Sequence, residues 1–281
     1  MRSVRFAADG RVRSGRAEGE GRGLVLLDEA GRAFRPDEVM FLPPVEPRAV
    51  IGIALNYRDH AAELSLAEPE APALFLKPPQ SLIGHGGRIL YPQGAQYMHY
   101  EAELAVVIGQ PARTVGEAEA LSHVRGYTIA NDVTVRDFVQ NVFRPPTKAK
   151  GFDTFCPLGP WLVEGEIDDP QDLAIRTLVN GREVQRGSTR DMVHGVAAMI
   201  AYVSAFVTLM PGDVLLTGTP KGISSIHAGD RVRIEIDGIG ALENPVAEDV
   251  QVSWTRPGIK PSATPLRGCQ QAAENGNLRL G

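Results

Sequence analysis

The chain has 281 residues, of which 43% are hydrophobic and 22% charged, a composition typical of a globular protein with a large core. A net charge of −5 and an isoelectric point near 5.7 argue against nucleic acid or an anionic membrane as a partner. The sequence lacks an apolar run of the about 20 residues that span a bilayer, and two cysteines cannot form a disulfide framework, so a cytoplasmic protein with reduced thiols is expected.

The first 47 residues consist of short β-rich segments separated by glycines, such as SVRFAADGRV and GLVLLDEAG. Alternating apolar and polar residues between turn residues are typical of strands. We therefore predict a small N-terminal β module over residues 1–47.

Further strands are predicted after residue 48. The segments are RAVIGIALNY, APALFLKPP, EAELAVVIG, GYTIANDVTV, GPWLVEGEI, AIRTLVNGREV, DVLLTGTP and DRVRIEIDGIGALENPV. The pairs Asn180-Gly181 and Asp237-Gly238 favour hairpin turns. Strands thus dominate the chain.

One segment has a convincing helical pattern. An apolar stripe predicts a helix over Asp191–Met210, which a Pro-Gly pair ends. We therefore expect a mainly β, α+β fold with few helices and a main domain over residues 48–254. A polar, loosely held tail is expected over residues 255–281.

The segment MHYEAELAVVIG places Glu101 and Glu103 in a run that is otherwise typical of a buried strand. Residues two apart in a strand share a face. On an open face two carboxylates need no explanation, but on an enclosed face both stay ionised only with a cation between them. The apolar residues that follow favour enclosure. Asp132 in GYTIANDVTVRD offers a third carboxylate, and three oxygen ligands favour Mg²⁺, Mn²⁺ or Ca²⁺ over zinc.

Five segments together resemble those of a known family. YMHYEAELAVVIG, GYTIANDVTVRD, KAKGFDTFCPLGP, TLVNGREVQRGSTRDM and LMPGDVLLTGTPKGI are similar, in this order, to signature segments of the fumarylacetoacetate hydrolase family. The resemblance implies a distorted β-roll core, a homodimer, and Mg²⁺ or Mn²⁺ held by Glu101, Glu103 and Asp132.

In LNYRDHAAELS, His60 and Glu63 stand three residues apart, so one helical turn places them on the same face. The carboxylate can then orient and polarise the imidazole. A lone histidine beside charged residues is more often a surface residue. The family resemblance, however, implies a lid helix whose His-x-x-Glu pair is the acid/base dyad, and the matching residues are His60 and Glu63.

The resemblance also implies residues that contact the substrate. In KAKGFDTF it implies a lysine facing the substrate beside the metal, and Lys150 matches it better than Lys148, although either can be a surface lysine. Thr219 in LTGTPKG matches a substrate-binding loop, where Gly and Pro let the backbone approach a ligand. Arg136 and Lys77 are further candidate anion contacts, with Arg136 preferred.

The function that the resemblance implies is a metal-dependent decarboxylase/isomerase of a carboxylated 2-oxohept-3-enedioate from the aromatic catabolism of 4-hydroxyphenylacetate. The substrate is thus expected to be a small 2-oxo acid. An alternative is a hydrolase that cleaves a carbon–carbon bond in an acylpyruvate or a fumarylacetoacetate-like β-diketo acid. A non-catalytic binding protein is a third possibility, against which the full set of predicted catalytic residues argues.

Overall fold

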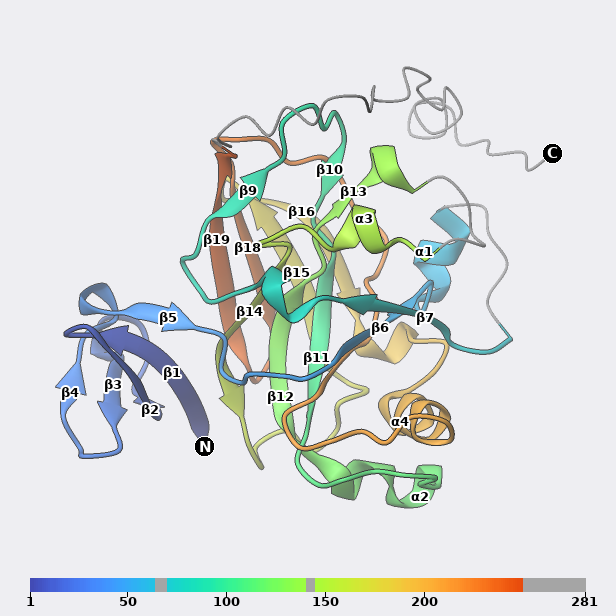
Figure 1. Cartoon of the computed structure of the whole chain (residues 1–281), viewed down its shortest axis with the longest axis horizontal. Coiled ribbons are helices and arrows are strands. Elements are labelled where there is room, and N and C mark those ends of the chain that lie inside the picture. The colour runs from blue at the N-terminus through green and yellow to red at the C-terminus, as the bar shows by residue number, and fades with distance from the viewer. Residues whose placement is uncertain (64–69, 140–144, 250–281) are drawn as a thin grey trace, which may run out of the picture.

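The computed structural model describes residues 1–63, 70–139 and 145–249 (Figure 1). Strands make up most of its regular structure, so the expectation of a mainly β fold with few helices is confirmed. The predicted tail over residues 255–281 lies outside the described residues, as does the end of the main domain. The domain boundary near residue 47 remains a prediction.

A large mixed sheet contains twelve of the described strands. Its order is β4 (Ala33–Phe34), β3 (Val25–Asp28), β2 (Arg11–Glu18), β1 (Arg2–Ala8), β14 (Cys156–Val163), β12 (Val124–Asn131), β11 (Ala102–Ile108), β17 (Val214–Leu216), β6 (Val50–Ala54) and β7 (Ala73–Lys77), with β5 (Met40–Leu42) on β1 and β8 (Leu82–Ile83) on β14. The predicted N-terminal strands therefore extend the main sheet, because β1 pairs with β14.

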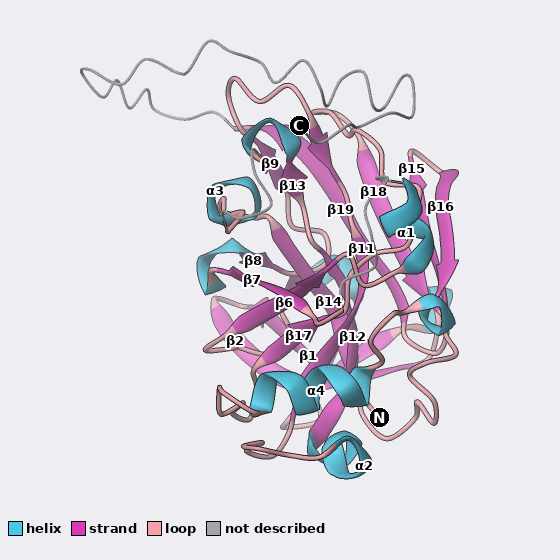
Figure 2. Ribbon diagram, turned by 90° about the vertical axis from the view of Figure 1, so that its right-hand side faces the viewer, coloured by secondary structure: helices cyan, strands magenta, loops and turns pink. Residues whose placement is uncertain are grey.

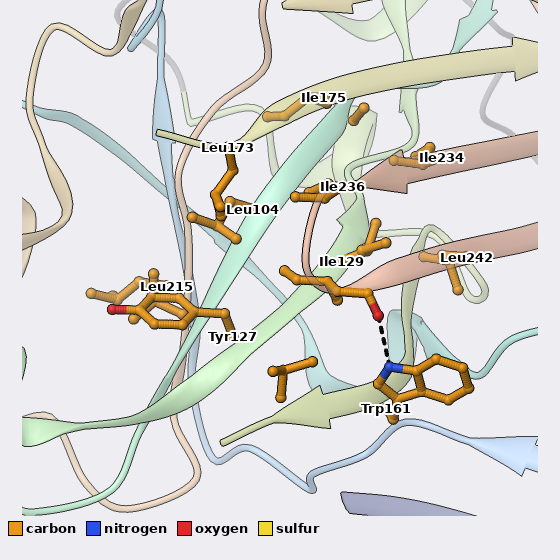
Figure 3. Packing of buried hydrophobic residues seen from close by; sticks show 14 of the residues in the cluster. Leu104, Tyr127, Ile129, Trp161, Leu173, Ile175, Leu215, Ile234, Ile236 and Leu242 are labelled. Atoms are coloured by element: carbon orange, nitrogen blue, oxygen red, sulfur yellow. Dashed lines mark hydrogen bonds between the residues drawn. The ribbon is translucent and has the colours of Figure 1, made fainter. Parts of the chain in front are cut away.

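A second sheet contains five of the described strands and packs against the first. Its order is β16 (Arg182–Ser188), β15 (Ala174–Val179), β18 (Arg231–Ile236), β19 (Gly240–Glu248) and β9 (Ile89–Tyr91). β10 (Met98–His99) and β13 (Thr134–Val135) form a separate pair. Figure 3 shows the core between the two sheets, where Leu104 and Ile129 of the first lie near Ile236 and Leu242 of the second.

Both predicted hairpin turns are present. Asn180 and Gly181 join β15 to β16 with φ values of +53° and +80°. Two successive positive φ values match the right-handed twist of the strands, and Asn and Gly adopt them at little cost. Gly238, with φ of +73°, lies in the turn between β18 and β19.

The described helices are short. They are α1 (Arg58–Glu63), α2 (Glu117–Ala120), α3 (Thr147–Lys150) and α4 (Val196–Ser204). Figures 1 and 2 show α2 and α4 at one end of the molecule, with α1 and α3 toward the other. None of the helices in the described residues has the length and apolar character needed to cross a bilayer.

The helix predicted over Asp191–Met210 is α4, which is shorter at both ends. Before α4 begins, Val193 donates its backbone N–H to the Asn56 carbonyl, and the Asn56 side chain bonds the backbone of His194. After it ends, Leu209 pairs with Ala112 as an isolated bridge. These tertiary hydrogen bonds use backbone groups that a longer helix requires, so the predicted bounds were wrong.

Candidate metal centre and active site

Strand register brings the three predicted metal ligands together. β11 and β12 are antiparallel neighbours, with Glu103 opposite Ala130. The Asp132 amide, just past the end of β12, donates to the Glu101 carbonyl over 2.9 Å. Carboxylate oxygens of Glu101, Glu103 and Asp132 all lie within 4.8 Å of one another, and the three side chains are buried.

The predicted alternation along β11 also holds. Ala102, Leu104, Val106 and Ile108 belong to the core between the sheets, whereas Ala105 and Val107 belong to a second apolar cluster on the opposite face. Glu101 and Glu103 continue the odd-numbered positions. Their shared face is therefore enclosed, which was the condition for the metal interpretation.

Three cations surround two of the carboxylates. The Lys150 ammonium donates to Glu101 Oε2 over 2.8 Å and to Asp132 Oδ2. The Lys77 ammonium donates to the other oxygen, Asp132 Oδ1. Arg136 donates to Glu101 Oε1 over 2.6 Å. Burial would raise the pKa of Glu101, but the charges of Lys150 and Arg136 outweigh it and hold that pKa below its ordinary value.

Glu103 differs from its neighbours. Its Oε2 accepts the Gly218 amide over 2.6 Å, and no lysine or arginine of the described residues forms an ion pair with it. Burial and then the charges of Asp132 and Glu101 raise its pKa well above the ordinary value. A divalent cation would remove this repulsion, and an all-oxygen donor set suits Mg²⁺ or Mn²⁺. The three carboxylates therefore fit a metal of this kind.

The predicted dyad lies on α1. His60 Nδ1 is 3.1 Å from Glu63 Oε2, as the one-turn spacing predicted. His60 is buried, and a positive charge on its ring would act on Glu101, so the dyad lies near the carboxylate cluster. Burial opposes ionisation of Glu63, but hydrogen bonds from His60 and the Gly222 amide lower its pKa. Because the ionised Glu63 only accepts, Nδ1 carries a proton and Nε2 is the nitrogen that can exchange a proton with a ligand.

The structure separates the other predicted contacts into two groups. Lys150 and Arg136 touch the carboxylates, whereas Lys148 lies over the Phe138 ring at 3.8 Å. Lys77 is 2% exposed and is enclosed between Asp132 and the Val133 carbonyl. A ligand would reach Lys77 only if Asp132 released it, so its predicted role as a substrate contact remains untested.

Thr219 lies in the loop that follows β17. Its neighbour Gly218 contacts Glu103, and Gly222 further along donates to both oxygens of Glu63 over 3.1 and 3.3 Å. This loop therefore connects the carboxylate cluster to the dyad. The position of this loop is consistent with substrate binding by Thr219, which remains a prediction.

His99 is a site residue that the sequence prediction missed. It is 6% exposed and accepts a 3.4 Å hydrogen bond from Arg136 Nε at Nδ1, while its Nε2 has no hydrogen-bond partner among the described residues. Burial, and then the charge of Arg136, lowers its pKa to about 3, so the ring is neutral. The same period-two alternation that singled out Glu101 and Glu103 includes His99 and would have identified it.

A cleft of about 1010 Å³ lies elsewhere, between the N-terminal strands and the β18–β19 hairpin. Its walls carry both arginines and acidic residues, among them Arg16, Arg233 and Glu235. None of the predicted site residues lines it. The predicted catalytic and metal-binding residues therefore lie away from this cleft, at or near the carboxylate cluster.

Comparison with known proteins agrees with this geometry. The profile of the family described as "Fumarylacetoacetate (FAA) hydrolase C-terminal" matches residues 49–247. A 4-hydroxyphenylacetate degradation bifunctional isomerase/decarboxylase from Salmonella dublin is 46% identical over 229 residues, which are 80% of this chain and 53% of the relative. The chain thus spans about half the length of this curated relative.

Solved structures show the same fold. The 5-carboxymethyl-2-hydroxymuconate delta-isomerase from Mycobacterium smegmatis has a TM-score of 0.81 and 42% identity, covering 89% of this chain and 100% of the other. A maleylpyruvate hydrolase from Sphingobium sp. SYK-6, in complex with manganese(II) and pyruvate, has a TM-score of 0.72 and 29% identity, covering 88% and 99%. With its fold, its carboxylate cluster and these matches, the chain belongs to the fumarylacetoacetate hydrolase family.

Proposed function

We propose that the protein is a divalent-metal-dependent decarboxylase/isomerase of a carboxylated 2-oxohept-3-enedioate, with Mg²⁺ or Mn²⁺ on Glu101, Glu103 and Asp132. The observation that carries the proposal is the buried carboxylate cluster with Lys150 on two of its members and the His60–Glu63 dyad, which the loop of residues 218–222 joins to the cluster. The names of the Salmonella relative and the mycobacterial isomerase support the same reaction class.

A bound divalent ion supplies Lewis-acid stabilisation of a developing enolate oxygen. Lys150 supplies a fixed positive charge beside it. Burial would lower the pKa of Lys150, but the charges of Asp132 and Glu101 raise it, so its ammonium stays protonated. It can therefore hold the carboxylate or oxo group of a 2-oxo acid.

In the decarboxylation step, the bond between C5 of a 2-oxo-3-ene acid and its carboxylate breaks, and carbon dioxide leaves. The electron pair moves through the C3–C4 double bond to the 2-oxo oxygen, so the step requires no nucleophile. The resulting dienolate must take up a proton at a chosen carbon. His60 can deliver it from Nε2 while Glu63 stabilises the imidazole at Nδ1 over 3.1 Å.

The proposal is tested with 5-oxopent-3-ene-1,2,5-tricarboxylate, following carbon dioxide release and the ultraviolet spectrum. Metal-stripped wild type and Glu103→Ala are each assayed with and without Mg²⁺ or Mn²⁺. We expect metal-dependent release by wild type alone. If wild type with metal releases no carbon dioxide, the decarboxylase assignment is wrong.

A second candidate is a carbon–carbon bond hydrolase of an acylpyruvate or a related β-diketo acid. The maleylpyruvate hydrolase in complex with manganese(II) and pyruvate favours it, since that enzyme has the same fold. In this reaction the His60–Glu63 dyad would activate a water molecule. Pyruvate release from an acylpyruvate, measured in the same metal-loaded samples, separates the two candidates.

We also propose that the protein is a homodimer, an expectation that comes from the family resemblance. Its mass in solution decides this, because one chain has a mass of 30.3 kDa. Light scattering of the eluting protein should give about twice that value. A mass of one chain across the working concentration range would contradict it.

A further inference from the structure

Gln185 carries a buried amide that touches the loop between the carboxylate cluster and the dyad. It lies on β16, is 3% exposed, and comes from the second sheet. Its Oε1 accepts the Thr177 hydroxyl over 2.7 Å. Its Nε2 donates to Thr219 Oγ1 over 2.9 Å and to the Pro220 carbonyl over 2.8 Å.

The orientation of this amide follows from its partners. The Pro220 carbonyl can only accept a hydrogen bond, so the group facing it must be the NH₂ of Gln185 and not the oxygen. The second N–H of the same group then points at the Thr219 hydroxyl. Thr219 therefore accepts at its oxygen, and its own proton must point elsewhere. Within the described residues that proton has no acceptor.

The second sheet also holds the loop in place. A Cβ on Gly187 of β16 would lie 2.5 Å from Pro220 Cβ, so the strand and the loop are in close contact at a position where only glycine fits. Gly222 has a φ of +99°, and a Cβ there would lie 3.2 Å from the Val184 carbonyl. The Thr219 hydroxyl therefore has little freedom to move away from Gln185.

The position of Thr219 indicates which acceptor its hydroxyl proton can reach. The preceding amide, of Gly218, binds Glu103, and Gly222 binds Glu63. An anion bound at the carboxylate cluster would therefore lie beside the loop that carries Thr219. A hydroxyl that already accepts from an amide is a suitable donor to a carboxylate oxygen.

We propose that Gln185 is a positioning residue that fixes the Thr219 hydroxyl as a hydrogen-bond donor to the carboxylate of a bound 2-oxo acid. The inference rests on the proposed function only in taking a 2-oxo acid as the ligand. It adds the second sheet to the binding machinery and explains why a buried glutamine lies on a strand that carries none of the predicted catalytic residues.

The test measures binding of pyruvate to the full-length, Mn²⁺-loaded protein by titration calorimetry. Gln185→Glu keeps the shape but offers an acceptor, which draws the Thr219 proton away from the ligand. We expect Gln185→Glu and Thr219→Val each to weaken pyruvate binding about tenfold. The double variant should bind no more weakly than either single one, because both remove the same hydrogen bond. Thr219→Ser, which keeps the hydroxyl, should restore binding to within about threefold.

A Mn²⁺ titration without pyruvate provides the matched control, since neither residue is a predicted metal ligand. Mn²⁺ affinity should change less than about twofold in each variant. If Gln185→Glu does not fold, Thr177→Val removes the hydrogen bond that holds the amide and should weaken pyruvate binding about threefold.

Several results would overturn the inference. One is unchanged pyruvate affinity in Gln185→Glu, or in Thr177→Val where that variant replaces it. A second is a double variant whose loss of pyruvate affinity equals the product of the two single losses. A third is wild-type protein that binds no pyruvate. If the protein binds pyruvate in a metal-dependent way and the variants behave as expected, but it does not decarboxylate 5-oxopent-3-ene-1,2,5-tricarboxylate, only the proposed function is contradicted. The role of Gln185 is then still supported.

Discussion

Glu103 combines burial with two neighbouring carboxylates and no ion-pair partner in the described residues. Its raised pKa means that the folded, metal-free protein holds this proton more tightly than the unfolded chain does. As the pH rises above the ordinary value of 4.5, the unfolded chain loses its proton first, so the free energy of unfolding falls. The carboxylate that a metal requires thus destabilises the empty fold at neutral pH.

We expect Glu103→Gln to stabilise the metal-free protein at pH 8, because glutamine cannot ionise. A gain on the order of 1 kcal/mol corresponds to a rise in Tm of about 2–4 °C. The advantage should shrink as the pH falls toward 4.5 and be lost below it, where Glu103 is protonated in both states. Thermal unfolding in the presence of a chelator, at several pH values, measures it.

Glu101→Gln is the matched control for this experiment. Glu101 accepts from Lys150 and Arg136, so its neutral replacement removes the carboxylate that pairs with Arg136 and one of the two that pair with Lys150. We expect this variant to be less stable than wild type under the same conditions, although it removes the same charge from the same strand face. A similar shift in both variants would contradict the account of Glu103.

We expect substitutions of Lys77 and Lys150 to have different effects, although both lysines contact Asp132. The side chain of Lys77 is fully enclosed, whereas that of Lys150 is 8% exposed. Lys77→Met should lower the free energy of unfolding by up to about 3–5 kcal/mol, since it breaks a buried pair. Urea unfolding measures this. Lys150→Met also breaks buried pairs, with Glu101 and Asp132, but it should in addition weaken 2-oxo acid binding. Unchanged 2-oxo acid binding in Lys150→Met would contradict the geometry.

The residues differ in how far the sequence could predict them. Glu101 and Glu103 follow from strand alternation, and Asp132 from a neighbouring motif, because these residues lie on adjacent strands. Gln185 has no such local signal. Its role depends on how the second sheet packs against the Thr219 loop, and that packing joins segments 34 residues apart.

At the scale of the element, α1 is a helix of six residues. Isolated helices of this length are unstable in water, so tertiary contacts must hold it. His60 and Ala61 are buried, and Glu63 accepts the Gly222 amide. Asp59, one turn earlier, accepts the Lys221 amide over 3.3 Å. The loop that carries Thr219 therefore also fixes the helix that carries the dyad.

We expect Glu63→Gln to reduce kcat by about 10²–10⁴, because the imidazole loses the carboxylate that stabilises its charged form. Glu63 has a lowered pKa, so wild type should keep this contribution as the pH falls to 4.5 and lose it only below that. A pH–rate profile of both proteins measures it. Asp59→Asn is the control, since it keeps the dyad, and its kcat should stay close to that of wild type.

The sequence predicted the elements themselves better than their ends. The apolar stripe of α4 has the helical period, yet Asn56 binds the backbone just before the helix. Ala112 does the same after it, by pairing with Leu209. Neither partner is near α4 in sequence. The hairpin at Asn180-Gly181 was predicted correctly because its turn depends on two adjacent residues alone.

Across the whole molecule, the candidate site joins both sheets. Glu103 of β11, the residue before β11 and the residue after β12 supply the carboxylates, and Lys77 at the end of β7 supplies one cation. The second sheet contributes through Gln185 and the loop at Thr219. A cation at the centre therefore interacts with side chains that the fold brings together from distant parts of the chain, so its binding should stabilise the fold as a unit.

We expect Mn²⁺ or Mg²⁺ to raise the free energy of unfolding by about 2.7 kcal/mol when its free concentration is 100 times Kd. The effect should be larger at pH 8 than at pH 5.5, because the proton on Glu103 must leave before the metal binds. Thermal unfolding of chelator-treated protein, with each metal added back, measures both. In Glu103→Gln, added metal should no longer raise the free energy of unfolding, whereas the metal-free variant should be more stable than metal-free wild type. The substitution thus changes metal binding and the stability of the metal-free fold in opposite directions. A full metal response in this variant would show that the ion binds elsewhere.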